Sequence, residues 1–217
     1  MFKLSGWRLG LSSFALLGML MTCAKQEQGP LPILGNKETL PDGTVRYHTI
    51  PELSFTDQDS LPFTWESLQG KIHVADFFFV SCPSICPMVT RQMLRVHEAF
   101  QNTENLLLVS YSIDPKRDTV GRLANYARNL DADTRRWKFL TGDKARLLGI
   151  AGKYFSIALE NPDAPGGFDH SGRLILVDSR RRVRAFCDGT DPDSVTAFMA
   201  SIRQLLQEEE RLKGPPN

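Results

Sequence analysis

The chain has 217 residues, which suits one domain with terminal extensions rather than several domains. Its formal net charge of +1 excludes a strong electrostatic attraction to nucleic acid, so we expect no nucleic-acid partner. Hydrophobic residues make up 41% of the chain and charged residues 24%, which is an ordinary globular composition.

The first residues are typical of a secretory signal. Lys3 and Arg8 precede an uncharged apolar stretch at 9–21, which is shorter than the roughly 20 residues that cross a bilayer comfortably. Cys23 follows, and the polar run after it resembles the start of a mature bacterial lipoprotein. We therefore expect a lipoprotein-type signal peptide at 1–22 and a lipid on Cys23. The alternative is an uncleaved anchor with an unmodified cysteine.

Residues 23–48 are rich in glycine, proline and polar side chains and show no periodicity, which predicts a tether to the membrane. A folded domain is expected at 49–213, followed by a short Gly-Pro-Pro tail at 214–217. Because either form of the N-terminus exports the chain, we expect the domain on the periplasmic side of a membrane, where disulfides can persist.

The hydrophobic pattern of the domain predicts alternating strands and helices. The expected elements are a hairpin within 50–65, a buried strand at 72–80, a helix at 88–100, a strand at 106–113, a helix at 121–130, a short strand at 137–140, a helix at 144–154, two strands at 173–177 and 182–187 paired through a polar turn, and a last helix at 194–211. This order predicts an α/β sandwich with a mixed central sheet flanked by helices. The run Glu208–Glu210 is interpreted as a solvated helix end.

Two cysteines follow directly on the predicted buried strand. Cys82 and Cys86 lie where the strand at 72–80 gives way to a helix, a position that lowers thiol pKa values and leaves side chains within reach of solvent. On one helical turn, their Cβ atoms would lie about 5–6 Å apart. The two sulfurs could then form a disulfide or bind one soft metal such as Cu(I), zinc or an iron–sulfur cluster.

A purely structural disulfide is the alternative for this pair. The loop it would close encloses very few residues, so the loss of chain entropy would stabilise the fold little. We therefore favour redox chemistry or metal binding.

A metal site needs a third ligand, and the four histidines differ in position. His97 lies about 16 Å along a helix from Cys86, and His73 lies up to about 30 Å from Cys82 along a strand. Neither can share a metal with the thiols, and we treat His48 as a surface residue. His170 follows a Gly-Gly run just before the strand at 173–177. Such loops carry function, but the residues alone leave ligand and surface residue equally open.

Three further polar residues are interpreted mainly as structural. Cys187 lies in an alternating strand pattern, which predicts a small buried side chain rather than a reactive thiol. Asp114 precedes a proline and forms a turn signal, and Asp118 or Thr119 is expected to cap the next helix. A role of the aspartates behind the site or in docking a partner stays open.

Three motifs together resemble the Sco/SenC family. They are Phe79–Pro87 (FVSCPSICP), Ser112–Thr119 (SIDPKRDT) and Asp169–Ser171 (DHS), in the same order and spacing. The resemblance covers roughly residues 50 to 210. It implies a thioredoxin-like sandwich with a mixed central sheet, flanking helices and an N-terminal β-hairpin.

The resemblance also implies a function. Members of the family bind copper, as Cu(I) or Cu(II), through two cysteines and a histidine, which here are Cys82, Cys86 and His170. They help to assemble the binuclear copper centre of cytochrome c oxidase subunit II, by delivering copper or by reducing that subunit's cysteines. We therefore expect subunit II or a similar copper-site protein as partner, and a monomer held to the membrane by its lipid.

The chain departs from the family pattern at three places that are not ligands. Ser84 stands where an acidic residue is common, Val120 where a proline is common, and Cys187 where an aromatic residue is common. The loss of the acidic residue bears on copper affinity and on partner docking.

Two functions from different classes follow. The first is a copper-binding assembly factor without enzymatic turnover. The second is a thiol–disulfide oxidoreductase that acts on partner cysteines, with Cys82 and Cys86 as the redox pair and Cys82 as the attacking thiolate. Thioredoxin-like oxidoreductases place a proline before the strand that faces the active site, and Asp169–Gly172 contains none. Both functions can coexist, because the thiols must be reduced to take copper.

Overall fold

The computed structural model describes residues 29–213, so the signal segment, Cys23 and the tail at 214–217 lie outside the described residues. A seven-stranded mixed sheet forms the centre, in the order β11-β10-β5-β6-β7-β3-β4. Its strands are β3 (Ser54–Asp57), β4 (Pro62–Thr64), β5 (Ile72–Phe78), β6 (Leu106–Ser112), β7 (Trp137–Thr141), β10 (Arg173–Val177) and β11 (Val183–Asp188). β5, β6 and β7 run parallel, and the other neighbours pair antiparallel. The predicted mixed sheet is therefore confirmed.

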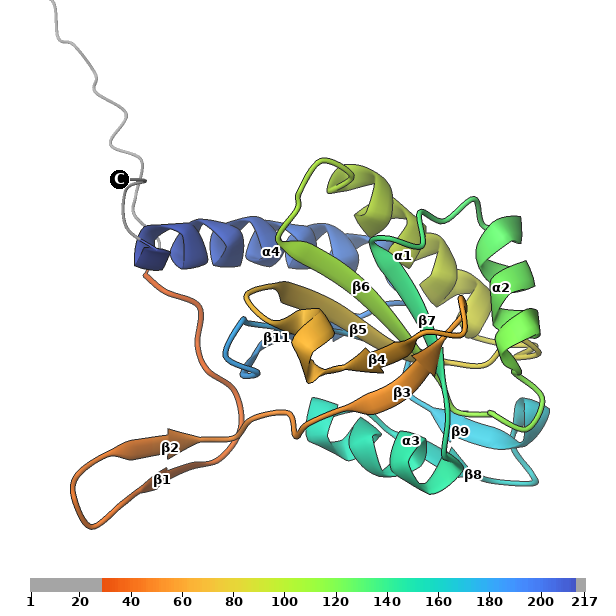
Figure 1. Cartoon of the computed structure of the whole chain (residues 1–217), viewed down its shortest axis with the longest axis horizontal. Helices are drawn as coiled ribbons and strands as arrows, with labels where there is room; N and C mark the ends of the chain where they lie inside the picture. Colours follow the sequence, from red (N-terminus) through yellow and green to blue (C-terminus); the bar gives the residue numbers. More distant parts are fainter. Residues whose placement is uncertain (1–28, 214–217) are drawn as a thin grey trace, which may run out of the picture.

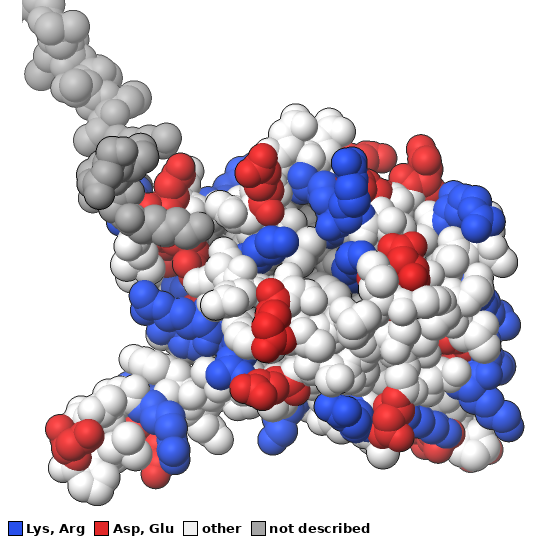
Figure 2. All heavy atoms as spheres, in the orientation of Figure 1, with Lys and Arg blue, Asp and Glu red and all other residues white. Residues whose placement is uncertain are grey.

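Helices cover both faces of this sheet (Figure 1). They are α1 (Cys86–Ala99), α2 (Val120–Asn129), α3 (Lys144–Ala151) and α4 (Pro192–Lys213), with short 3-10 turns η1 (Trp65–Leu68), η2 (Gly152–Tyr154) and η3 (Pro165–Gly167). None of the helices within the described residues combines the length and hydropathy needed to cross a membrane. Lysines and arginines are interspersed with acidic residues on the face seen in Figure 2, in keeping with the near-zero net charge.

The alternation of side chains along β5 divides the core into two halves. Phe78 stacks on Tyr126 of α2 with ring centroids 5.4 Å apart, and Phe77 points to the opposite face, where it stacks on Tyr111 at 5.2 Å and meets Tyr154 of η2. Every residue of β5 and β6 is buried. Covered faces on both sides explain why these strands are continuously apolar in the sequence.

The structure adds two short hairpins that the sequence does not reveal. β1 (Lys37–Thr39) pairs with β2 (Val45–Tyr47), and β8 (Ala158–Glu160) pairs with β9 (Phe168–His170). Strands of three residues are too short to give a visible period of two. The hairpin predicted within 50–65 is present as β3 and β4, and the helix expected at 144–154 divides into α3 and η2.

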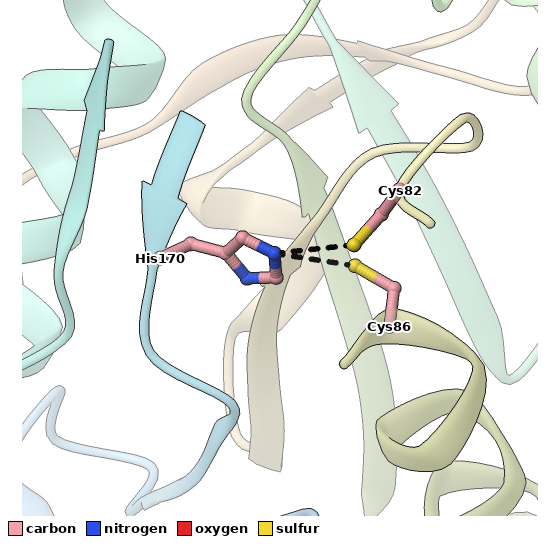
Figure 3. A group of neighbouring side chains, drawn as sticks. All are labelled: Cys82, Cys86 and His170. Atoms are coloured by element: carbon pink, nitrogen blue, oxygen red, sulfur yellow. Dashed lines mark hydrogen bonds between the residues drawn. The ribbon is translucent and has the colours of Figure 1, made fainter. Parts of the chain in front are cut away.

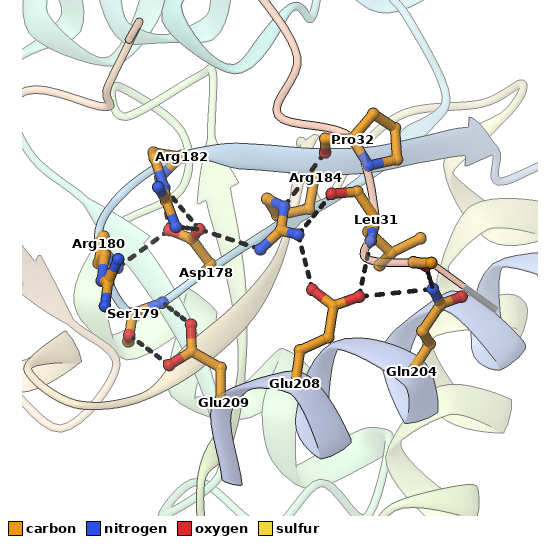
Figure 4. A network of polar contacts seen from close by, with 11 residues as sticks. Leu31, Pro32, Asp178, Ser179, Arg180, Arg182, Arg184, Gln204, Glu208 and Glu209 are labelled. Atoms are coloured by element: carbon orange, nitrogen blue, oxygen red, sulfur yellow. Dashed lines mark hydrogen bonds and ion pairs between the residues drawn. The ribbon is translucent and has the colours of Figure 1, made fainter. Parts of the chain in front are cut away.

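Part of the segment assigned to the tether contacts the domain. The backbone N–H of Leu34 donates to the carbonyl of Val183 at 2.8 Å, and the N–H of Leu31 donates to Glu208 Oε1 at 2.6 Å. Arg184 bonds the carbonyls of Leu31 and Pro32 (Figure 4). The domain boundary at residue 49 stays a prediction, but ordered contacts of the chain with the domain begin well before it.

A buried ion-pair network lies behind this contact (Figure 4). The Arg184 side chain, 6% exposed, pairs with Asp178 at 3.3 Å and with Glu208 at 2.7 Å. Glu209 accepts a hydrogen bond from the Ser179 hydroxyl at 2.7 Å. The interpretation of the acidic run as a solvated helix end is therefore wrong for Glu208 and Glu209, because arginine and serine partners on the β10–β11 side of α4 hold both carboxylates.

Two buried titratable side chains lie on opposite faces of β5. His73 meets the Tyr154 hydroxyl at 3.0 Å, and burial lowers the pKa of His73 to about 3. Asp76 accepts a hydrogen bond from the Ser110 hydroxyl, and burial raises the pKa of Asp76 to about 7. At mildly acidic pH, both side chains are therefore uncharged in the folded protein.

These two groups should oppose each other in the pH dependence of stability. The neutral His73 contributes stability that is present above about pH 6.5 and is lost as the pH falls. The protonated Asp76 contributes stability that is present at low pH and is lost as the pH rises toward about 7. Asp76→Asn removes only the second effect. The free energy of unfolding of this variant, relative to the unsubstituted protein, should rise by about 1.4 kcal/mol per pH unit between about pH 4.5 and 6.5.

Urea unfolding at several pH values measures this difference. Asp133→Asn is the matched control, because Asp133 has a pKa lowered to about 2 by its hydrogen bonds with Arg135 and stays ionised throughout this window. A constant difference between Asp76→Asn and the unsubstituted protein would mean that the Asp76 carboxyl ionises normally in the fold.

Candidate metal site

The two cysteines lie at the junction of β5 and α1, as predicted. The backbone N–H of Cys82 donates to the carbonyl of Phe79 at 3.1 Å, which closes a turn just after the strand. Cys86 is the first residue of α1, and Pro87 occupies the first helical turn, where no N–H is needed. The expectation that both thiols share one helical turn is wrong, because Cys82 lies in the turn before the helix.

His170 faces both sulfurs (Figure 3). Its Nε2 lies 3.5 Å from Cys82 Sγ and 3.6 Å from Cys86 Sγ, although the side chains come from positions 88 and 84 residues apart in the chain. The residue was expected in a loop, and it ends the short strand β9, where it pairs with Ala158 of β8. The hairpin β8–β9 forms its own sheet beside the central one and presents the imidazole to the dithiol.

The arrangement fits a soft metal ion. One ligand atom from each of Cys82, Cys86 and His170 lies within 4.8 Å of the others, and among the described residues this is the group placed to hold a metal ion. A trigonal ion with bonds of about 2.0 Å to nitrogen and 2.3 Å to sulfur would hold these atoms about 3.7 Å apart. The observed nitrogen–sulfur distances are close to this value. Two sulfurs and one imidazole are donors suited to copper or zinc.

The other histidines are held elsewhere. His73 is buried against Tyr154, and His97 accepts a hydrogen bond from the backbone N–H of Asp133 at 3.3 Å. His48 meets the carbonyl of Lys153 at 2.8 Å. None of the three belongs to the cluster, as the sequence analysis predicts.

Cys187 is a buried free thiol of β11, and burial raises its pKa to about 12, which suits a structural rather than a reactive side chain.

The two thiols of the cluster differ in acidity. Burial would raise the pKa of Cys82, but hydrogen bonds from the backbone and side chains of Ser84 and Cys86 outweigh it and lower that pKa. Burial raises the pKa of Cys86 far above its ordinary value, and the negative charges of Cys82 and Asp76 raise it further. The Ser84 hydroxyl lies 3.6 Å from Cys82 Sγ. A neutral donor therefore supports the thiolate at the position where the resembled family commonly has an acid.

The imidazole of His170 is uncharged near neutral pH. Burial lowers the pKa of His170 by more than the Phe77 carbonyl and the Asp169 carboxylate raise it. Its ring forms a T-shaped pair with Phe79, with centroids 5.5 Å apart and planes at 74°. A neutral imidazole with a free lone pair is the form that binds a metal.

The motif Ser112–Thr119 lies directly behind the cysteines. Asp118 or Thr119 is predicted to cap α2, and the cap is Thr119, whose hydroxyl oxygen accepts the backbone N–H of Arg122 at 3.4 Å. Asp118 has another role: its buried carboxylate accepts the backbone N–H of Val80 at 3.1 Å and the Ser112 hydroxyl at 2.7 Å. The pattern of turn and cap residues hides this contact, because it joins Asp118 to a segment 38 residues away.

Comparison with known proteins gives one consistent family. A family model described as SCO1/SenC matches residues 42–207. A SCO1/SenC family lipoprotein from Bacillus anthracis is 25% identical in structure-based comparison, with a TM-score of 0.67 over 73% of this chain and 95% of that chain.

Two other solved structures carry more specific descriptions. BsSco is described as having a disulfide switch and as a member of the Sco family of cytochrome c oxidase assembly proteins. It is 27% identical, with a TM-score of 0.61 over 71% of this chain and 92% of its own. Copper-bound ScoI from Arabidopsis thaliana is 26% identical, with a TM-score of 0.59 over 71% of this chain and 98% of its own.

These likenesses agree with the geometry of the molecule. The mixed sheet with helices on both faces matches the thioredoxin-like fold of the neighbouring structures. The family model covers most of the chain, including both cysteines and the histidine of the cluster. The chain therefore belongs to the SCO1/SenC family.

Proposed function

We propose that this protein is a copper-binding assembly factor that loads or prepares the binuclear copper site of cytochrome c oxidase subunit II. The observation that carries the proposal is the convergence of Cys82, Cys86 and His170 within 4.8 Å of one another. The copper in the ScoI relative and the description of BsSco as an assembly protein support it.

Copper is the cargo of the proposed site. Two thiolates and a neutral imidazole suit Cu(I), and the same set can also hold Cu(II). Three protein donors leave room for a fourth, so a thiolate of the recipient could bind the ion before the carrier's own ligands release it. Both thiols must lose their protons on binding. Because its pKa is high, Cys86 keeps its thiol proton near neutral pH, and the incoming copper ion must displace this proton as it binds.

The proposal includes attachment to a membrane. Cys23 lies outside the described residues, and we propose that it carries the lipid and holds the domain on the periplasmic side. The sequence before it and the lipoprotein from Bacillus anthracis support this placement. We also propose that the domain acts as a monomer and meets its partner from that position.

The reduced protein should bind about one equivalent of copper, and His170→Ala should bind it much more weakly. Removing a residue that only hydrogen-bonds to a metal ligand typically lowers metal affinity about 10- to 100-fold. Removing a ligand itself should therefore lower the affinity by at least this much. Anaerobic titration with Cu(I) against a competing chelator measures the affinity. Cys82→Ser should lose tight binding in the same assay.

His73→Asn and His97→Gln are the matched controls, because these histidines lie outside the cluster. Each should keep the affinity of the unsubstituted protein. Full-strength binding by His170→Ala would remove the imidazole from the proposed ligand set.

A thiol–disulfide exchange activity is the second candidate, and the unequal acidity of the two thiols favours it. A thiolate attacks a partner disulfide, and the sulfur of the partner leaves as a thiolate. Cys82, with its lowered pKa, is the better nucleophile, and Cys86 would then displace the partner from the mixed disulfide. The disulfide switch described for BsSco supports this candidate.

Iodoacetamide should therefore modify Cys82 faster than Cys86 in the reduced, copper-free protein near pH 7. The physical reason is that only the thiolate reacts, and its fraction is larger at Cys82. Mass spectrometry of peptides from a time course measures both rates, and buried Cys187 serves as the unreactive reference. Equal rates at Cys82 and Cys86, or faster modification of Cys86, would contradict the assignment of the attacking thiol.

A further inference from the structure

The segment at 114–119 contacts both halves of the metal site. On one side, Asp118 holds the backbone of Val80, two residues before Cys82. On the other side, the preceding residue reaches the loop that leads to His170: Arg117 Nη2 donates to the carbonyl of Gly166 at 2.8 Å. Neighbouring side chains of one short segment thus touch the segment 79–82 that leads to Cys82 and the loop that leads to His170.

The guanidinium of Arg117 lies against two aromatic rings at the join. Its central carbon is 5.8 Å from the centroid of Phe79 and 6.0 Å from that of Phe168. These rings are 5.2 Å apart, and one belongs to the cysteine segment while the other belongs to β9. Asp114 pairs with Nε of the same guanidinium and fixes its direction. Lysine could not make these contacts at once, because it lacks the planar fork.

Gly166 shows how closely the two segments approach. It has a φ of +80°, and a Cβ atom there would lie 2.6 Å from the Phe79 ring and 3.3 Å from Pro83. The histidine loop therefore rests directly on the segment that carries Cys82. The bond from Arg117 to the Gly166 carbonyl holds the loop at this point of contact.

We infer that Arg117 is a positioning residue that sets the reach of His170 to the two thiols. It ties the loop before β9 to the segment 114–119, which Asp118 in turn fixes to Val80, two residues before Cys82. The inference rests on the proposed function in that it assigns Arg117 a part in copper affinity. It is distinct from that function because the position of the imidazole can be measured without metal.

Arg117→Gln tests this role in the full-length protein in detergent. It should weaken Cu(I) binding about tenfold, the lower end of the range for residues that orient a metal ligand, because Arg117 acts through the loop and not on His170 directly. Arg117→Lys should fall short of the unsubstituted affinity as well, because it keeps the charge but not the fork. Lys116→Gln is the matched control, since it removes an exposed charge from the adjacent residue. It should bind copper normally.

A double substitution shows whether Arg117 acts through the imidazole. If it does, Arg117→Gln combined with His170→Ala should bind copper no more weakly than His170→Ala alone. A merely structural or electrostatic effect on the thiols would instead multiply with the loss of the histidine. Thermal melting of each copper-free variant shows whether it is folded, and Arg117→Lys decides the question should Arg117→Gln fail to fold.

NMR of the copper-free, reduced protein gives the independent reading. The His170 and Phe79 rings form a T-shaped pair with centroids 5.5 Å apart, so the ring-current shift of the carbon-bound protons of His170 depends on where the imidazole lies relative to Phe79. Arg117→Gln should move that resonance, and Lys116→Gln should leave it in place. An unchanged resonance, unchanged copper affinity, or multiplying losses in the double variant would each overturn the role of Arg117. Absence of copper binding by the unsubstituted protein would overturn the proposed function instead, and the resonance would still decide the positioning role.

Discussion

The packing of the histidine loop on Phe79 is the constraint on which the metal site depends. Phe79 contacts Phe168 and His170 at once, and Gly166 lies against its ring without a side chain between them. Phe79 directly follows β5, a strand that is buried along its whole length, and its own side chain is 1% exposed. The hairpin β8–β9 forms a separate sheet and does not pair with the strands of the central one. Its imidazole keeps its place through contacts with this one aromatic residue and its neighbours.

The surroundings of the site also give its two thiols different pKa values. Cys82 lies in a turn where N–H groups and the Ser84 hydroxyl support a negative charge, whereas Cys86 lies deeper, above the carboxyl of Asp76. One thiol is ready to react and the other holds its proton until a metal or a disulfide replaces it. Copper binding and thiol exchange, the two functions proposed above, would thus both draw on one asymmetric pair.

Much of the fold could be predicted from the sequence, because long buried strands and amphipathic helices have clear periods. The dithiol was predictable for the same reason, since it follows the strongest apolar run. The position of His170 could not be derived from local pattern: it depends on packing between segments 88 residues apart, and only the likeness of three motifs singled it out. The contacts of Arg117 and Asp118 were hidden in residues typical of turns and caps.

Helix α4 also fixes how far the cluster stands from the point where the chain enters the domain. Gln204 and Glu208, near its C-terminal end, hold Gly29 and Leu31. Thr190, two residues before the start of α4, lies beside Gly172, which also approaches Ile85 next to Cys86. The 22 residues of α4 span about 33 Å. The cluster and the point where the chain enters the domain therefore lie toward opposite ends of α4, so a recipient would present its own copper ligands to the end of the domain remote from Gly29.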